Sequence, residues 1–276
     1  MPRQRHLLIL LPGLLLVLLL CLIPVFMVAK VTLFDPDFTL RHVERFFAQP
    51  VYLNVLLRTL RTALWVALLC LAIGYPTAYF IVTQSESARP ILLFLILLPM
   101  WMSILIQTYA WMVLLGREGI ANSLLMELGL TGQPLQLLFN SSAVRLVMVQ
   151  ILLPIMILTC FGGMSAIDRS LVPAARIMGA SRFAAFREVF LPLSLRAALN
   201  GTTIVFILSM GFFITPALLG GRSDAMIGNL ITLQVEQGNW GFAGTIALVL
   251  LASALCVMWL INMLGRRFVY EARETA

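Results

Sequence analysis

Few residues of this chain could perform covalent or metal chemistry, and their positions argue against both. The two histidines, His6 and His42, lie outside every long apolar stretch. The cysteines lie inside apolar stretches without the spacing of a metal site, and they are Cys21, Cys70, Cys160 and Cys256. We therefore expect no catalytic residue and no metal site.

The chain also lacks the residues of a common ATP-binding motif. It carries one lysine, Lys30, among 19 basic residues. A phosphate-binding loop of the G-x4-G-K-[ST] type needs its lysine directly beside a glycine, whereas Lys30 lies in the glycine-free stretch VAKVT. If ATP drives this protein, another chain hydrolyses it. We expect no cofactor in this chain, and in that case ATP and Mg²⁺ would be bound by a partner ATPase.

One long polar interruption separates the apolar segments, and its residues predict two short helices. It reads SLVPAARIMGASRFAAFREVFLP from Ser170 to Pro192. Ser170 and Ser181 are suitable N-caps, and Pro173 would lie in the first turn of the first helix, where a missing N–H is tolerated. Gly179 is the expected stop between the helices. The second helix is expected to end near Leu191, with a bend in the chain at Pro192.

The second predicted helix carries an aromatic face. Phe183, Phe186 and Phe190 follow i, i+3, i+7 spacing and therefore share one side of a helix. Such a ridge suits a contact in which a helix enters a groove of a partner protein. The same pattern also fits helices that pack on their own bundle, and the helical spacing alone does not separate the two interpretations.

The spacing within this stretch resembles the EAA loop of ATP-binding-cassette (ABC) importer permeases, whose pattern is E-A-A-x3-G-x9-I-x-L-P. Here Pro173 replaces the Glu, and Val189 stands at the Ile position. A polar contact of that Glu is therefore not carried over. The resemblance implies a cytoplasmic coupling loop over 168–194 that docks on an ATPase subunit. Its residues are Pro173, Ala174, Ala175, Gly179, Phe183, Phe186, Val189, Leu191 and Pro192.

The composition is that of an integral membrane protein. Of 276 residues, 61% are hydrophobic and 11% are charged, against about 25% charged residues in soluble domains. Charge-poor runs long enough to cross a bilayer predict six spans in a single permease domain over 1–276. The spans are expected at about 7–29, 60–84, 90–115, 146–167, 197–221 and 242–265. The predicted fold class is an all-α membrane protein with a cytoplasmic two-helix loop.

The basic residues predict the orientation. With the N-terminus inside, 11 basic residues lie on the cytoplasmic side and 8 on the outer side, which agrees with the positive-inside rule. The coupling loop and the residues directly after it contribute Arg169, Arg176, Arg182, Arg187 and Arg196. These arginines could instead anchor helix ends at lipid phosphates. We expect both termini in the cytoplasm and a location in the bacterial inner membrane.

The acidic residues argue against a carrier driven by an ion gradient. None of the 12 acids falls within a predicted span, whereas carriers coupled to protons or sodium place ionisable groups in the membrane for function. A secondary carrier and a non-transporting membrane scaffold remain the alternatives to an ATP-driven permease.

Several other stretches resemble permeases of the spermidine/putrescine group of ABC importers. They are Gly74-Tyr75-Pro76, LLPMWMSILIQTYAWMVLL, GIANSLL and TPALLGG. This resemblance implies a second homologous permease, two ATPase subunits and an extracytoplasmic solute-binding protein as partners, and no nucleic acid. The implied solute is a polyamine or a related small organic amine, with an unrelated solute as the alternative.

Four residues could line a solute pathway, namely Gln107, Tyr109, Trp111 and Asn229. The amides offer hydrogen bonds, and Tyr109 or Trp111 could make cation–π contacts with an amine. The two aromatic residues could equally belong to the belt of aromatic side chains at the membrane interface.

Overall fold

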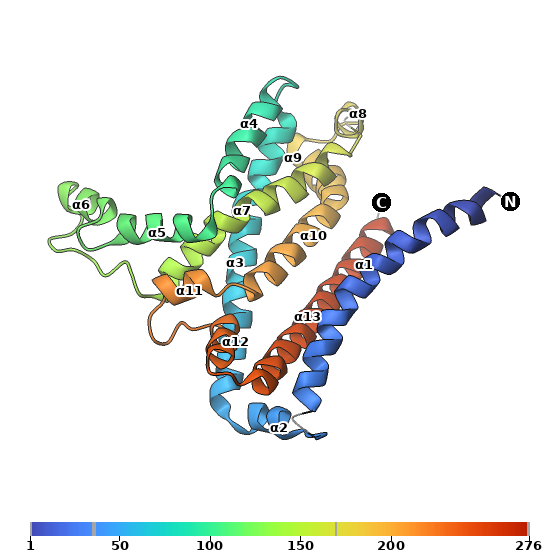
Figure 1. The fold of residues 1–276 in the computed structure, drawn as a ribbon. Helices are drawn as coiled ribbons and strands as arrows, with labels where there is room; N and C mark the ends of the chain where they lie inside the picture. The colour runs from blue at the N-terminus through green and yellow to red at the C-terminus, as the bar shows by residue number, and fades with distance from the viewer. Residues whose placement is uncertain (1, 35–36, 169, 275–276) are drawn as a thin grey trace. The chain divides into compact units, whose positions relative to one another are not determined.

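The structure is a computed structural model that describes residues 2–34, 37–168 and 170–274 (Figure 1). Arg169 of the predicted coupling loop lies outside the described residues. The described residues form helices and no β-strand, which confirms the predicted all-α class. The elements are α1 (Pro2–Leu33), α2 (Arg41–Ala48), α3 (Pro50–Thr83), α4 (Ala88–Leu97), η1 (Leu98–Trp101), α5 (Ile104–Leu115), α6 (Ile120–Glu127), α7 (Ser141–Ser165), α8 (Leu171–Ile177), α9 (Arg182–Ala185), η2 (Phe186–Phe190), α10 (Leu191–Met210), α11 (Ile214–Leu219), α12 (Ile227–Glu236) and α13 (Trp240–Glu274).

In the described part of the chain, five helical segments are long and apolar enough to cross a membrane. They are Leu15–Leu33, Pro50–Thr83, Ser141–Ser165, Arg182–Met210 and Trp240–Ile261. A sixth crossing results if the bent pair Ala88–Trp101 and Ile104–Glu127 counts as one span. The predicted spans coincide with these segments, with differences at the third and fifth.

The third span, expected as one helix over 90–115, is broken. Its two parts meet at an angle of 91° between Trp101 and Ile104. Pro99 lies in the first turn of the 3₁₀ helix η1, and Met102 is extended. The Ser103 hydroxyl then accepts a hydrogen bond from the backbone N–H of Leu105 at 3.3 Å and starts α5 as a new helix. One helix therefore ends near Pro99, and the next begins after Ser103.

The fifth span begins earlier than expected and stays helical through Pro192. One helical segment runs from Arg182 to Met210, through the five-residue π-helical turn η2. Pro192 has no N–H, and its ring crowds the carbonyl of Glu188, one turn before it. The wider π turn lies at this position and accommodates the missing hydrogen bond. After Met210 the helix stops, and the short α11 follows. The segment 222–240, expected as a loop, contains α12.

By its internal contacts, the chain expected to form one domain divides into two compact units. One comprises Met1–Asn54 with Leu230–Ala252, and the other comprises Val55–Asn229 with Ser253–Ala276. In the first unit an aromatic cluster holds α2: the rings of Tyr52 and Phe242 lie 4.9 Å apart, and the guanidinium of Arg45 lies 4.4 Å from the Phe242 ring.

In the second unit α7 packs along α10 and also contacts α5 and α11 (Figure 1). Small residues allow the close approach. A Cβ at Gly163 would collide with the side chain of Ala197, and one at Gly201 would lie 2.8 Å from the Met156 sulfur. The α7–α10 pair is therefore a tightly packed support for the segment 166–190 that connects the two helices.

Candidate functional site

The segment between α7 and α10 has a defined geometry centred on Gly179. The backbone of Gly179 has a φ of +99°, a left-handed conformation that favours glycine. Its N–H donates to the carbonyl of Arg176 at 3.1 Å, and the N–H of Ala180 donates to the carbonyl of Ala175 at 3.1 Å. These bonds end α8 in the manner of a glycine C-cap. The helix stop predicted at Gly179 is thus present.

Of the two predicted caps, one is confirmed and the other is wrong. The Ser181 hydroxyl accepts from the backbone N–H of Ala184 at 3.1 Å at the start of α9. Ser170 makes no side-chain cap. Its backbone is already helical, and its N–H instead donates to Oδ1 of Asp168 at 2.9 Å. This hydrogen bond lowers the pKa of the Asp168 carboxyl, because it stabilises the ionised form.

The predicted aromatic ridge is divided between the bundle and the surface. Phe186 and Phe190 stack with ring centroids 5.8 Å apart, and both make edge contacts with Tyr79 of α3, at 5.2 and 5.0 Å. Phe190 is buried, and Phe186 is half-buried. Phe183 is 72% exposed. The prediction of one continuous exposed ridge is therefore wrong. Two of the three rings pack on the chain's own bundle, as the alternative interpretation had it. Tyr79, which is distant in sequence, takes Phe186 and Phe190 into the bundle and leaves Phe183 outside it.

The most exposed apolar residues of the segment instead lie within four residues of Gly179 in the chain. Ile177 is 87% exposed, Met178 is 83% exposed, and Phe183 follows four residues after the glycine. We refer to Ile177, Met178 and Phe183 as the apolar tip. Sequence reasoning missed Ile177 and Met178, because they form no periodic pattern. Their place directly before the helix-stopping glycine was the available signal.

The remaining motif residues lie at different depths. Pro173 and Ala174 are exposed on α8, whereas Ala175 is buried. Val189, Leu191 and Pro192 are half-buried around the start of α10. Beside them, the hydroxyl groups of Tyr75 and Ser194 form a hydrogen bond of 2.6 Å between α3 and α10. Sequence reasoning did not assign this role to Tyr75. The base of the segment is therefore fixed to the bundle, and its tip is exposed.

Two of the predicted pathway residues belong to one hydrogen-bonded group. Gln107 is buried, and its amide donates to the carbonyls of Pro99 and Met102 at 2.8 and 3.1 Å. The side chain of Gln150 on α7 donates to Gln107 at 3.2 Å and accepts from the Trp111 indole at 3.2 Å. Gln107 thus donates hydrogen bonds to backbone carbonyl groups at the break between η1 and α5, and this role is structural.

The other two pathway residues lie apart from this group. The Asn229 side chain accepts from the N–H of Met226 at 2.9 Å and donates to the carbonyl of Phe213 at 2.8 Å. It therefore holds the chain after α10 to the start of α12. Tyr109 is 51% exposed on α5. A pathway role for these four residues stays a prediction.

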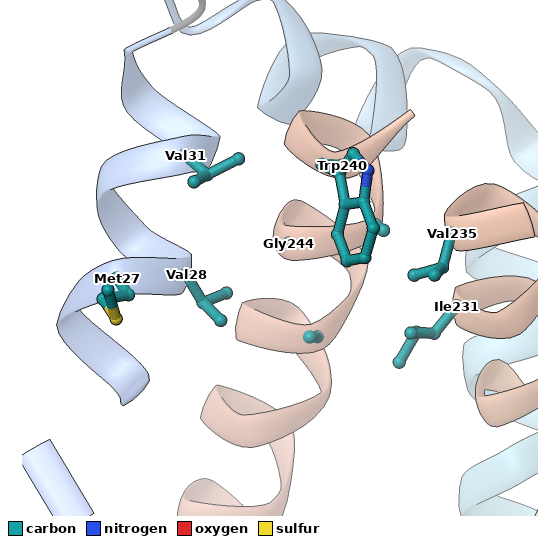
Figure 2. A pocket seen from close by; sticks show the side chains of 9 residues that line it. Met27, Val28, Val31, Ile231, Val235, Trp240 and Gly244 are labelled. Atoms are coloured by element: carbon teal, nitrogen blue, oxygen red, sulfur yellow. The ribbon is translucent and has the colours of Figure 1, made fainter. Parts of the chain in front are cut away.

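An apolar pocket of about 500 Å³ lies in the first unit, between α1, α12 and α13 (Figure 2). Its lining consists of Met27, Val28, Val31, Ile231, Val235, Trp240, Ala243, Gly244 and Ala247. The indole N–H of Trp240 is the single polar side-chain group in this lining. A charged or strongly polar solute would lose its hydration there without compensating hydrogen bonds. This pocket is therefore not the candidate site.

Comparison with known proteins gives a consistent picture. Residues 6–270 match the family described as "Binding-protein-dependent transport system inner membrane component". The chain is 34% identical to the spermidine/putrescine transport system permease protein PotB of Salmonella typhimurium over 241 residues, which cover 86% of this chain and 84% of the relative. It is 35% identical to PotB of Escherichia coli strain K12, over 80% of this chain and 82% of the relative.

A solved structure shares the fold. It is a bacterial alginate ABC transporter in complex with an alginate pentasaccharide-bound periplasmic protein. The similarity has a TM-score of 0.72 and 18% sequence identity, and it covers 97% of this chain and 96% of the compared chain.

Proposed function

The chain belongs to the family of binding-protein-dependent transport system inner membrane components, and we propose that it couples ATP hydrolysis on a partner subunit to polyamine import. It is a multi-pass permease subunit of an ABC importer and not itself an enzyme. The proposed complex contains a second homologous permease, two ATPase subunits and an extracytoplasmic solute-binding protein.

The apolar tip is the observation that supports the coupling role. Ile177, Met178 and Phe183 expose apolar side chains on a polar connection between two membrane helices. Exposed apolar groups that gather on one surface are typical of an interaction site. Arg176 and Arg182 flank the tip and are also exposed. The tip would enter an apolar groove on the ATPase subunit, while both arginines face its polar rim.

The packing below the tip explains how movement would pass to the membrane helices. Phe186 and Phe190 contact Tyr79 of α3, and Ser194 is hydrogen-bonded to Tyr75 of the same helix. Since packed cores move as rigid bodies rather than deform continuously, a displacement of the tip would move α3 and α10 together. The proposed mechanism is alternating access driven by closure of the ATPase dimer.

The orientation follows from the same role. An ATPase in the cytoplasm requires the segment 168–194 on the cytoplasmic side, so both termini are proposed to lie there as well. The excess of basic residues predicted for that side supports this arrangement.

The proposed solute class rests on relatives whose names specify spermidine and putrescine. We therefore expect proteoliposomes that contain the assembled complex to take up radiolabelled spermidine or putrescine, with loaded binding protein outside and ATP inside. Unlabelled polyamine should compete, and alginate oligosaccharide should not. Uptake that follows an ion gradient without ATP would indicate a secondary carrier. Binding of partners without any solute flux would indicate a scaffold.

A further inference from the structure

A second pocket lies in the unit formed by Val55–Asn229 and Ser253–Ala276. It has a volume of about 360 Å³. One side is formed by Leu115, the last residue of α5, and by Arg117, and the other side is the segment 135–139, which precedes α7. Most of the lining is leucine, together with Gln136 and Phe139. The pocket therefore combines apolar walls with one cationic side chain.

The cation in this lining has no partner in the part of the chain that the structure describes. Among the described residues, no hydrogen bond or ion pair is formed by the Arg117 guanidinium, and Arg117 is exposed. The neighbouring Glu118 is exposed as well and is not part of the lining. An unpaired arginine beside apolar walls matches a ligand that carries a carboxylate, because the guanidinium fork binds carboxylates through two hydrogen bonds.

Buried hydrogen bonds hold the two walls of the pocket in place. Asn122 is fully buried, and its amide donates to the carbonyls of Gly116 and Leu135 at 2.9 and 3.1 Å. Its carbonyl accepts from the N–H of Leu135 at 2.8 Å. One side chain thereby joins the residues next to Arg117 to the start of the segment 135–139.

A second asparagine fixes the other end of that segment. The amide of Asn140 donates to the carbonyls of Gln136 and Leu137 at 3.1 and 3.0 Å, while its carbonyl caps α7 by accepting from Ser142 and Ala143. Phe139 is 53% exposed and has a φ of +58°, which a non-glycine residue adopts only at a cost. A pocket fixed in this way needs little ordering when a partner binds.

The pocket and the apolar tip lie beyond opposite ends of the same helix. Ser141 begins α7 directly after the pocket, and Ser165 ends it shortly before Asp168 (Figure 1). A helix of this length spans about 37 Å, which is enough to cross a bilayer. With the tip in the cytoplasm, the pocket faces outward.

We propose that this pocket receives a segment of the extracytoplasmic binding protein in which a carboxylate lies beside an apolar side chain. The carboxylate pairs with Arg117, and the apolar side chain contacts Phe139 and the leucines of the segment 135–139. This inference rests on the proposed function, because the binding protein is the partner proposed for that side.

The test is the ATPase activity of the assembled complex, titrated with loaded binding protein. Arg117→Glu should raise the half-saturating concentration of binding protein by about tenfold, since like charges would then meet, with basal ATPase activity unchanged. Arg41→Glu, which changes the charge of an exposed arginine on α2 in the same way, should leave the half-saturating concentration within about twofold of wild type, as expected for a charge outside the contact.

Phe139→Gly removes the ring and keeps the backbone conformation, because glycine accepts positive φ. We expect it to raise the half-saturating concentration about fivefold, as for the loss of an aromatic contact, without lowering the thermal unfolding midpoint. If both Arg117→Glu and Phe139→Gly showed the half-saturating concentration of the wild type, this inference would be overturned. The proposed function would remain intact. The proposed function itself would fail if binding protein did not stimulate the wild-type complex.

Discussion

Replacing Met178 with aspartate is expected to lower ATP-dependent uptake by about 100-fold, with membrane insertion intact. Met178 is 83% exposed in the isolated chain, so the substitution costs the chain's own fold little. In the proposed complex it would place an unpaired carboxylate in an apolar groove. It would also remove an apolar contact worth roughly 1.5–3 kcal/mol, and every 1.4 kcal/mol corresponds to about tenfold in affinity. Uptake by proteoliposomes and co-purification of the ATPase subunit measure the effect.

The aromatic residues of the same segment supply a matched comparison. Phe183→Asp should behave like the Met178 variant, because Phe183 is also part of the apolar tip. Phe186→Asp should instead lower the thermal unfolding midpoint, since Phe186 packs on Tyr79 and Phe190. Normal uptake in both the Met178 and Phe183 variants would show that the apolar tip does not dock on the ATPase.

Gly179→Val is expected to impair coupling because of the backbone and not because of side-chain size. No atom lies within 4 Å of a Cβ built at Gly179, so the added volume meets nothing. The φ of +99° is the obstacle, because a β-branched residue resists it. The strain costs about 1–3 kcal/mol, and the chain can relieve it by changing the turn that sets the position of Met178. We expect a tenfold or greater loss of uptake, in line with that strain.

A graded series separates conformation from bulk at this position. Asparagine tolerates left-handed backbone better than other non-glycine residues, so Gly179→Asn should retain more uptake than Gly179→Val. The comparison requires equal amounts of assembled complex, measured by co-purification of the ATPase subunit. Equal and unimpaired uptake in both variants would mean that the turn at Gly179 does not set the position of the apolar tip.

The sequence predicts the membrane helices well, because hydrophobic length is a local property. Four of the six predicted spans coincide with continuous helices. The break in the third span depends on Pro99 and Ser103, which lie inside an otherwise apolar run and were outweighed by its hydrophobicity. The continuation of helix through Pro192 depends on a π turn, which leaves no recognisable pattern in hydropathy.

The candidate site was predictable where its geometry is local. Gly179 and Ser181 act on backbone groups within a few residues, and both were placed correctly. Phe186 was misplaced because its partner, Tyr79, is distant in sequence. The same holds for Gln107, whose buried amide is paired with Gln150 of α7. A single sequence does not reveal which residues distant along the chain lie in contact.

Crosslinking measures whether Met178 contacts an ATPase subunit, as the proposed coupling role requires. A single cysteine at Met178, in a chain whose four native cysteines are replaced, should crosslink to the ATPase subunit in the assembled complex. A cysteine at Leu128, which is 71% exposed at the end of α6, should not. A complex in which Leu128 crosslinks to the ATPase, or in which Met178 reacts only with the extracytoplasmic binding protein, would show that the apolar tip does not dock on the ATPase.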